Sequence, residues 1–475
     1  MSGVTLREGR DSQQSSYHFI GIGGVGMSAL AFVLCQQGYT VSGSDSASNP
    51  RIQRLQQLGV RFALGHSADH IVGSPNVVYS SAIQPNNPEV VEALSRGLPL
   101  LHRADVLALL MNSRPSIGVA GTHGKTTTSS MIGYMLLQCQ ADPTLVIGGE
   151  MDAWSGNARV GQGTHLVAEV DESDGSLTRL HPTVGVITNI ELDHPDHYKE
   201  LGHVISTFQH YAQQCQVVVA SLDCPNVATH ADWLQVTLGY SLYEHPLATY
   251  TVREVTYQGH HTQALVYEQG TRLGLLELQV PGSHNLSNAL AAVAVGRYLG
   301  LAFADIAHAL KSFQGAHRRF EVKGNVENVL FVDDYAHHPS EIRATLAAAR
   351  LQQRRVVAVF QPHRYSRLST LFAEFVTSFE EADMVVLVPT YGAGEPPHAH
   401  ISSATLAAAM AEHHPQVHYL PALVDLPQHL SQSVQPNDIV LFLGAGDLNH
   451  QIAASIEAFS RHRVDLRTAV ELPRS

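Results

Sequence analysis

The clearest chemistry in the sequence belongs to a turn rich in glycine and threonine that carries one lysine. It reads GTHGKTTT (121–128), follows the apolar run 117–120 and precedes a helix-like stretch at 129–137. In such a turn, backbone N–H groups close around phosphate oxygens, Lys125 brings a cation to the β- and γ-phosphates, and a threonine hydroxyl reaches Mg²⁺. The turn therefore predicts a site for a nucleoside triphosphate, made by Gly121, Thr122, His123, Gly124, Lys125, Thr126 and Thr127.

The spacing of this turn departs from the usual phosphate-loop pattern. Val119 stands five residues before Gly124, where G-x-x-x-x-G-K-[ST] has glycine, so that the loop is the more compact G-x-x-G-K-T-T. A glycine- and threonine-rich turn without a ligand is the alternative. The agreement of strand, loop, lysine and helix favours the phosphate site.

A second glycine loop lies near the start of the chain. Its residues GIGGVG (21–26) fit G-x-G-x-x-G after the apolar run 18–20, and Asp45 lies 19 residues beyond Gly26. Such glycines let a pyrophosphate approach the helix N-terminus, and the acid contacts a ribose hydroxyl. The loop predicts a dinucleotide or nucleotide-sugar site, contacted by Gly21, Gly23, Gly24, Gly26 and Asp45. NAD binding and a purely structural turn are the alternatives, and the later triphosphate loop makes a nicotinamide enzyme less economical.

Two acidic segments follow the triphosphate loop. Glu169, Asp171, Glu172 and Asp174 stand at the end of one apolar run, and the segment NIELDHPDH (189–197) ends the next. Nucleotide-bound Mg²⁺ takes one or two carboxylates, waters and phosphate oxygens as ligands, so these segments predict its site. Glu169 lies within its strand, where a buried charge is costly unless it meets a cation. The spacing alone leaves open which acid is the ligand.

The elements that must hold these segments form three α/β blocks. The first, 1–113, shows a strand at 18–20, a helix to residue 37 and a strand at 40–43, which is typical of half a Rossmann fold. A chain of 475 residues is consistent with three such domains at ~150 residues each.

The second block, 114–318, has strands at 166–170 and 184–188 beside the phosphate loop, and its pattern then changes. Alternation of apolar and polar residues over 248–280 indicates a small antiparallel meander inserted into this domain. The third block, 319–475, fits a mainly parallel, Rossmann-like sheet. Its strand and helix runs are 356–360, 384–388, 439–443 and the helical 341–350.

Composition narrows the classes of function. The formal net charge of −13 disfavours nucleic acid as a partner, and no apolar run approaches the ~20 residues of a membrane span. The four cysteines are too sparse for a disulfide framework, and residues 1–16 are polar. We therefore expect a cytoplasmic protein. Oligomeric state has no signal in the sequence.

Eight ordered segments resemble the Mur ligase family, and the resemblance spans nearly the whole chain. They are GIGGVGMSAL (21–30), GTHGKTTT (121–128), AEVDESD (168–174), NIELDHPDHY (189–198), GSHNLSNAL (282–290), FQGAHRRFE (313–321), VDDYAHHP (332–339) and QPHRYSR (361–367). One departure is Pro195, which follows His194 where the family usually has methionine.

The resemblance implies roles for individual residues. Lys125 and Thr126 would serve the ATP phosphates and Mg²⁺, and Thr126, Glu169 and His194 would be the metal ligands. Lys125, Glu169, His194 and Arg319 would form the catalytic set. The expected nucleotide contacts outside the loop are Asn285, Asn288, Arg319 and Asp334.

Within the family, the closest resemblance is to members that join L-alanine to the lactyl carboxylate of UDP-N-acetylmuramate during peptidoglycan synthesis. In that reaction the carboxylate attacks the γ-phosphate of ATP to give an acyl phosphate, and two anions must approach each other. Lys125, Mg²⁺ and Arg319 would neutralise them. The first glycine loop would then hold the UDP-sugar.

The amine of L-alanine must attack while its own carboxylate is held. The resemblance assigns this to Tyr335, His363, Arg364 and Arg367 in the C-terminal block. A guanidinium can hold a carboxylate through two parallel hydrogen bonds. A solvated basic loop over 361–367 is the alternative.

Three other functions stay open at this point. A ligase of the same family that recycles a murein peptide shares most motifs, but the pair Arg364 and Arg367 favours a single amino acid. An NAD-dependent oxidoreductase would use the first glycine loop and leave Lys125 unexplained. A non-catalytic nucleotide-binding regulator would release no phosphate from ATP.

Overall fold

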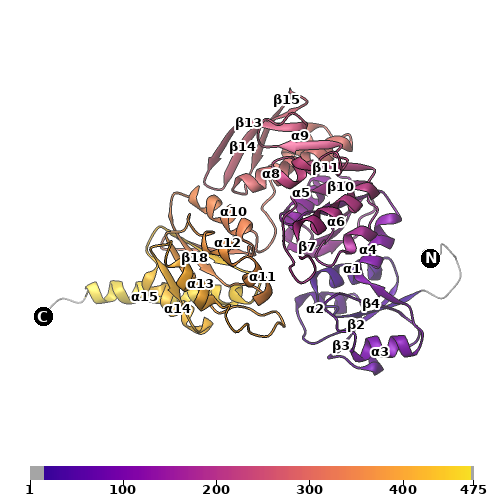
Figure 1. Ribbon diagram of the computed structural model, residues 1–475, viewed down its shortest axis with the longest axis horizontal. Helices are drawn as coiled ribbons and strands as arrows, with labels where there is room; N and C mark the ends of the chain where they lie inside the picture. The colour runs from indigo at the N-terminus through magenta and orange to yellow at the C-terminus, as the bar shows by residue number, and fades with distance from the viewer. Residues whose placement is uncertain (1–14, 472–475) are drawn as a thin grey trace.

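Three β-sheets, each with helices packed on it, organise the chain. The computed structural model describes residues 15–471, with side chains described to residue 464. In Figure 1 the N-terminal and central parts form one elongated body, and the C-terminal part lies beside it as a separate lobe. This arrangement confirms the predicted α/β fold with three sheets. The domain limits at 113/114 and 318/319 stay predictions.

The N-terminal sheet is parallel throughout, with strand order β3-β2-β1-β4-β5. This is the order of a Rossmann half with its switch point beside β1, where the first glycine loop lies. Its elements are β1 (Ser16–Ile20), α1 (Val25–Gln36), β2 (Thr40–Asp45), α2 (Pro50–Gln57), β3 (Arg61–Leu64), β4 (Asn76–Tyr79), α3 (Pro88–Ser95), β5 (Leu100–His102) and α4 (Arg103–Asn112).

The central sheet has ten strands in the order β15-β14-β13-β12-β11-β10-β6-β9-β7-β8. Strand β6 lies in its middle and is buried over all of its residues, as its apolar sequence predicts. The elements are β6 (Ser116–Ala120), α5 (Lys125–Gln138), β7 (Thr144–Met151), β8 (Gly156–Arg159), β9 (Leu166–Glu169), β10 (Val184–Ile187), α6 (Leu201–Gln214), β11 (Val217–Ser221), α7 (Pro225–Thr229), β12 (Leu238–Ser241), β13 (Ala248–Gln258), β14 (His261–Glu268), β15 (Thr271–Leu278), α8 (Ser283–Tyr298) and α9 (Phe303–Lys311).

The predicted antiparallel meander is β13–β15. It does not stand apart from the domain, because β13 pairs in parallel with β12 and so extends the central sheet. Helices α8 and α9 lie against it near the end of the body in Figure 1. The meander and the phosphate-loop strand therefore share one apolar core.

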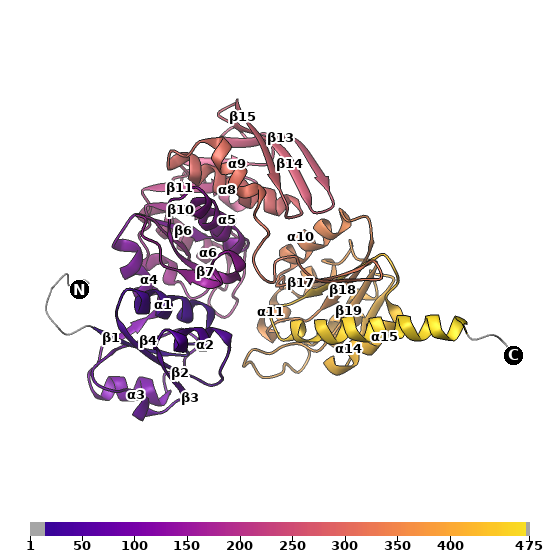
Figure 2. The same cartoon turned by 180° about the vertical axis from the view of Figure 1, so that it is seen from behind.

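The C-terminal sheet has strand order β16-β17-β21-β18-β19-β20, and only the β16–β17 pair in it is antiparallel. Figure 2 shows the last helix, α15, running along this lobe and beyond it. The elements are β16 (Glu321–Val326), β17 (Val329–Asp334), α10 (Pro339–Arg350), β18 (Arg355–Phe360), α11 (Tyr365–Thr370), α12 (Phe372–Val376), β19 (Met384–Leu387), α13 (Ser403–Met410), β20 (Val417–Tyr419), α14 (Leu426–Ser433), β21 (Asp438–Leu443) and α15 (Ile452–Glu471).

Among the described residues, the helices are all too short or too polar to cross a membrane.

Candidate functional site

The triphosphate loop joins β6 to α5, as predicted, and Lys125 is the first residue of the helix. Gly121 and Gly124 have φ of 141° and 78°, a region that side chains disfavour. A Cβ at Gly124 would also stand 2.9 Å from Oδ1 of Asn288. Both glycines are therefore required by the backbone path, which leaves the loop open to a ligand.

Lys125 lies under the loop and faces acids. Its Nζ is 2.9 Å from both carboxylate oxygens of Glu172 and donates to the carbonyls of Gly121 and Thr122 at 2.6 and 3.1 Å. Burial alone would lower the pKa of Lys125, but the charges of Glu172, Asp171 and Glu169 outweigh it and raise that pKa. The ammonium is thus a fixed cation held against the loop.

His123 links the loop to the C-terminal lobe. Its Nδ1 lies 3.4 Å from Oε1 of Glu341 on α10, and its Nε2 lies 3.4 Å from Oε2 of Glu191. Burial opposes the charged form, yet the two carboxylates raise the pKa of His123 to about 10. The imidazole is therefore a second cation of the loop at neutral pH.

A cavity of about 240 Å³ adjoins the loop and gathers the predicted nucleotide contacts. Asn285 and Asn288 reach it from α8, and Arg319 and Asp334 reach it from the start of the C-terminal lobe. Asn288 is tied to the loop helix, because Thr128 Oγ1 donates to its Oδ1 at 3.0 Å. The sequence missed several lining residues, among them His284, Ser340 and Glu341, and the only signal for His284 was its place in the segment 282–290.

Arg319 contacts the central part of the chain, and Asp334 lies at the same cavity from the C-terminal part. Asp334 accepts hydrogen bonds from the N–H groups of Phe320 and Ala336, both at 2.8 Å. Burial raises the pKa of Asp334 to about 6, against the attraction of Arg319. Arg319 itself lies 3.4 Å from Thr126 Oγ1 and 5.3 Å from the centre of the Tyr335 ring.

The predicted metal ligands fall into two neighbouring groups. Glu169 accepts a hydrogen bond from the Gly148 N–H at 2.8 Å and has another with the Thr126 side chain. Burial raises the pKa of Glu169, and the charge of Lys125 acts in the opposite direction. His194 forms a second group with Asp171 and Glu172, whose ligand atoms lie within 4.8 Å of one another. Burial would lower the pKa of His194, but the bond with Glu172 and the charge of Asp193 raise it. The metal set of Thr126, Glu169 and His194 stays a prediction.

The first glycine loop is held by Asp45. Its Oδ2 accepts from the Gly23 N–H at 2.9 Å, and a Cβ at Gly23 would come within 3.0 Å of the same oxygen. Asn49 and Arg51 both donate to the Gly23 carbonyl, at 3.1 and 2.9 Å. Asp45 therefore contacts the loop backbone, and its expected contact with a ribose stays a prediction, as do the expected ligand contacts of Gly21, Gly23, Gly24 and Gly26.

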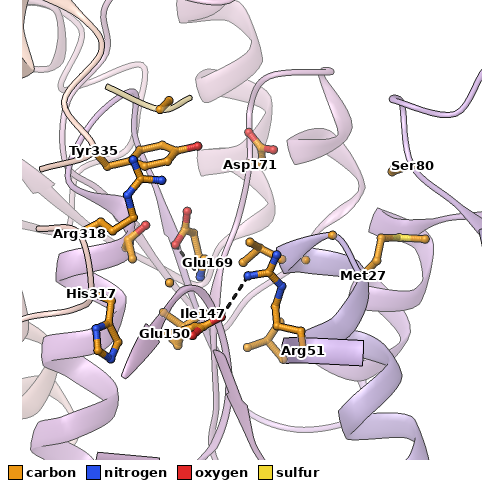
Figure 3. Close-up of a pocket in the computed structure, with 18 of the residues that line it drawn as sticks. Met27, Arg51, Ser80, Ile147, Glu150, Glu169, Asp171, His317, Arg318 and Tyr335 are labelled. Atoms are coloured by element: carbon orange, nitrogen blue, oxygen red, sulfur yellow. Dashed lines mark hydrogen bonds and ion pairs between the residues drawn. The ribbon is translucent and has the colours of Figure 1, made fainter. Parts of the chain in front are cut away.

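A cavity of about 800 Å³, larger than the one beside the phosphate loop, opens between this loop and the C-terminal lobe. In Figure 3, Arg318 and Tyr335 lie across it from Met27, Arg51 and Ser80, with Glu169 and Asp171 between the two sides. Gly24 and Gly26 of the first loop also line it.

Sequence reasoning missed several residues of this cavity. Arg51 pairs with Glu150 at 3.0 Å, and Arg103 pairs with Asp171 at 2.7 Å. Single arginines without a motif gave no signal. Other residues that it missed include Ser80, Ser81, Asn449 and His450.

The predicted amino-acid residues line a third cavity, of about 230 Å³, together with Lys125 and His194. They are Tyr335, His363, Arg364 and Arg367. Burial, reinforced by Arg367, lowers the pKa of His363 to about 4, so its ring is neutral near pH 7. The fork of Arg367 faces Asp193 of the central part, with Nε to Oδ1 at 2.9 Å. His338, at the N-terminus of α10, caps that helix by accepting from the Ser340 N–H.

Three family models match successive stretches of the chain. The model described as Mur ligase family, catalytic domain, matches residues 16–115. The Mur ligase middle domain matches 119–296, and the Mur ligase, glutamate ligase domain, matches 318–446.

Individual proteins are similar over almost the same length. A UDP-N-acetylmuramate–L-alanine ligase of Synechococcus sp. (strain JA-3-3Ab) is 65% identical over 445 residues, which cover 94% of this chain and 87% of that protein. A protein of the same name from Synechococcus sp. (strain JA-2-3B'a(2-13)) is 64% identical over 95% of this chain and 94% of its own. The crystal structure of a UDP-N-acetylmuramate-alanine ligase from Thermotoga maritima has a TM-score of 0.80 at 30% identity, over 95% of this chain and 99% of that one. With relatives this similar along nearly its whole length, the chain belongs to the Mur ligase family.

Proposed function

We propose that this protein joins L-alanine to the lactyl carboxylate of UDP-N-acetylmuramate with ATP, as a step of peptidoglycan synthesis. The products are UDP-N-acetylmuramoyl-L-alanine, ADP and phosphate, formed through an acyl phosphate. The observation that carries this proposal is the meeting of three cavities at one guanidinium. Arg319 lines all three of them, and Thr126, Glu169 and Tyr335 line both the largest and the third.

Each cavity suits one substrate. The cavity of about 240 Å³ beside the phosphate loop would hold the adenosine of ATP, with its phosphates on the loop. The largest cavity, beside the first glycine loop, has the volume for a nucleotide sugar. The third, beside Lys125, would hold L-alanine. Their common edge is where carboxylate, γ-phosphate and amine must meet.

Lys125 and Arg319 would neutralise the two anions that react first. Both cations are already fixed by the protein, Lys125 by Glu172 and Arg319 by its contact with Thr126, so they need little rearrangement when charge develops. A carboxylate oxygen of the sugar then attacks the γ-phosphorus, the bond to the ADP oxygen breaks, and the acyl phosphate forms.

Mg²⁺ fits the site by the chemistry of its donors. Glu169, Asp171 and Glu172 supply carboxylate oxygens close to the phosphate loop, and Thr126 supplies a hydroxyl. Thr126, Glu169 and His194 are the ligands that we propose. When bound, the ion would neutralise the phosphates and orient them, in addition to Lys125.

The second half of the reaction places the amine of L-alanine at the acyl carbon, and phosphate leaves. Arg364, Arg367 and His363 would hold the amino-acid carboxylate, with Tyr335 beside them. A cavity of about 230 Å³ suits one small amino acid better than the peptide of a recycling ligase. An NAD-dependent oxidoreductase would have no use for Lys125 or the third cavity. We place the reaction in the cytoplasm, where ATP and UDP-sugars are made.

Release of phosphate from ATP tests the proposal directly. We expect release only when ATP, UDP-N-acetylmuramate and L-alanine are all present with Mg²⁺, and mass spectrometry should find the alanyl product. Omission of each component in turn is the control. Phosphate release that required a murein peptide in place of L-alanine would contradict the proposed substrate, and absence of release with every amine would contradict a ligase.

A further inference from the structure

Arg367 is the most deeply buried cation of the amino-acid cavity, and its partner comes from another part of the chain. The residue is 4% exposed and Asp193 is 5% exposed. Nε lies 2.9 Å from Oδ1 and Nη2 lies 3.3 Å from Oδ2, so two parallel hydrogen bonds join the pair. Arg367 belongs to α11 of the C-terminal lobe, whereas Asp193 follows β10 of the central sheet.

The pair fixes which edge of the guanidinium a substrate can reach. Asp193 takes the edge formed by Nε and Nη2, and Nη1 lies 3.3 Å from Nδ1 and 3.4 Å from the carbonyl oxygen of His363. A guanidinium has five N–H donors, so one N–H of Nη2 remains for a ligand, which would share Nη1 with His363. A second carboxylate at the Nε edge would have to displace Asp193 and leave a buried anion without its partner.

The other arginine of this cavity is held quite differently. Arg364 makes one contact of 3.2 Å with Asp196, and the two side chains are 37% and 52% exposed. Exposed pairs of this kind contribute little and rearrange easily. Arg364 is therefore free to turn toward a ligand, while Arg367 is held in one orientation by the central part of the chain.

The cross-contact is one of several between the same two parts. Ser340 Oγ of α10 donates to Glu191 Oε2 at 2.5 Å, and Glu341 of α10 faces His123 of the phosphate loop. Asp193 thus belongs, with His123 and Glu191, to the surface of the central part on which the C-terminal lobe is docked. Arg367 is oriented by a residue that its own lobe does not contain.

We propose that Asp193 is the positioning residue of the amino-acid site. It holds the Arg367 fork so that the Nη1 and Nη2 side faces the cavity, and it makes the site for the amino-acid carboxylate complete only when the C-terminal lobe is docked on the central part. This inference rests on the proposed function, and Asp193, although it also lines the cavity, acts through Arg367.

Steady-state kinetics of Asp193→Asn test the proposal. Asparagine keeps the size of the side chain but removes the charge that orients the buried guanidinium. We expect the KM for L-alanine to rise about 10- to 100-fold, on the scale for a buried pair that loses one partner, with the KM for ATP and for UDP-N-acetylmuramate changed less than about 2-fold. Asp193→Glu, which restores a carboxylate, should recover part of the L-alanine affinity.

Two matched variants serve as comparisons. Asp383→Asn removes an equally forked pair, with Arg350 at 2.8 and 3.2 Å, that lies within the C-terminal lobe and outside the cavity, and it should leave all three KM values unchanged. Asp196→Asn breaks only the exposed pair with Arg364, and should raise the KM for L-alanine less than about 3-fold. Thermal unfolding of every variant shows whether it is folded.

A double variant supplies an independent readout. If Asp193 acts through Arg367, then Asp193→Asn combined with Arg367→Lys should have a KM for L-alanine close to that of the single variant with the higher KM. Independent, multiplicative effects would overturn the inference, and so would a parallel rise of all three KM values, which would indicate general loss of docking. An unchanged KM for L-alanine in Asp193→Asn would overturn it as well while leaving the proposed function intact. If the wild type used a different amino acid, L-alanine would be wrong as the proposed substrate. The same KM comparison, made with that amino acid, would still decide the role of Asp193.

Discussion

Two glycine loops in this chain occupy the same place in their sheets and have different chemistry. Each leaves a central parallel strand, turns through glycines and enters a helix, α1 in one case and α5 in the other. The first loop, 21–26, carries no charged residue of its own and is held by the carboxylate of Asp45. The second, 121–128, carries Lys125 and His123, both cationic and both paired with acids.

The difference shows that the path of a glycine loop supplies N–H donors, while its side chains decide what can happen there. N–H groups at a helix N-terminus are sufficient to hold a diphosphate that does not react. A reacting phosphate also needs fixed positive charge, because its transition state spreads negative charge over several oxygens. The first loop is thus suited to binding and the second to transfer.

The largest test of this contrast removes the cation of the second loop. We expect Lys125→Ala to lower turnover at least ~10²-fold, the scale for loss of one preorganised electrostatic contact. Phosphate release from ATP measures it. Lys311→Ala, which removes an exposed lysine paired with Glu277, is the control and should keep normal turnover. Near-normal release by Lys125→Ala would mean that the two loops do not differ in the way argued.

The complementary test concerns the first loop. Asp45→Asn weakens the charge-assisted hydrogen bond to the Gly23 N–H, and we expect the KM for UDP-N-acetylmuramate to rise about 10- to 100-fold, on the scale of a hydrogen bond to a charged group. The KM for ATP should not change. The control is Asp69→Asn, at an exposed position between β3 and β4 of the N-terminal sheet. Equal effects on both substrates would show that the loops are not separate sites.

Both loops could be predicted from the sequence because their signals are local. Glycine spacing, an apolar strand before and a helix after lie within about twenty residues, and the structure has these elements within about four residues of the predicted ends. The signal for the meander β13–β15 was equally local, since alternation of apolar and polar residues indicates a strand with one buried face. Its junction with β12 was not predicted, because strand pairing depends on the whole sheet.

The paired charges of the site had no such signal. Arg367 and Asp193 are 174 residues apart, and Arg103 and Asp171 are 68 apart. Each arginine, taken alone in the sequence, resembles an exposed cation. The sequence likewise placed acids near the metal site but could not show that Glu172 is occupied by Lys125, because that depends on the side-chain directions at the ends of β9 and β6.

The Mg²⁺ dependence of the rate can show which of the side chains near the second loop bind the metal. If Thr126, Glu169 and His194 are the ligands, Glu169→Gln and His194→Ala should each raise the Mg²⁺ concentration at half-maximal rate roughly 10-fold, the scale for weakening a metal site. Titration of MgCl₂ at fixed ATP measures this concentration, and Asp171→Asn is the companion variant. A shift in Asp171→Asn and His194→Ala without a shift in Glu169→Gln would move the metal to the group of Asp171, Glu172 and His194.

The first loop also depends on a buried acid that lies behind it. Glu89, in the first turn of α3, is 0% exposed and accepts from Ser44 Oγ at 2.7 Å, while His18 and His70 lie 2.9 and 3.1 Å from its oxygens. Ser44 in turn accepts the N–H groups of Gly21 and Ile22 on its carbonyl. Glu89 therefore supports the first loop from within the fold without reaching the cavity.

The smallest effect on activity, and the sharpest on stability, should come from this acid. Burial raises the pKa of Glu89, but hydrogen bonds from His18 and Ser44 prevail and lower it from 4.5 to about 2. A folded pKa below the unfolded value stabilises the fold above pH ~4.5, and this contribution is lost as the pH falls toward 2. Glu89→Gln should therefore destabilise the N-terminal sheet by about 1–3 kcal/mol at pH 7, with the difference from wild type shrinking as the pH falls below 4.5.

Hydrogen exchange of the β1 and β2 amides measures this loss of stability. Turnover at neutral pH should change less than about 3-fold because Glu89 contacts no substrate. Glu92→Gln, on the same helix and in a surface pair with Arg96 at 3.7 Å, should show neither effect. A difference between Glu89→Gln and wild type that persisted unchanged down to pH 3 would mean that packing, and not the charge of Glu89, holds the first loop in place.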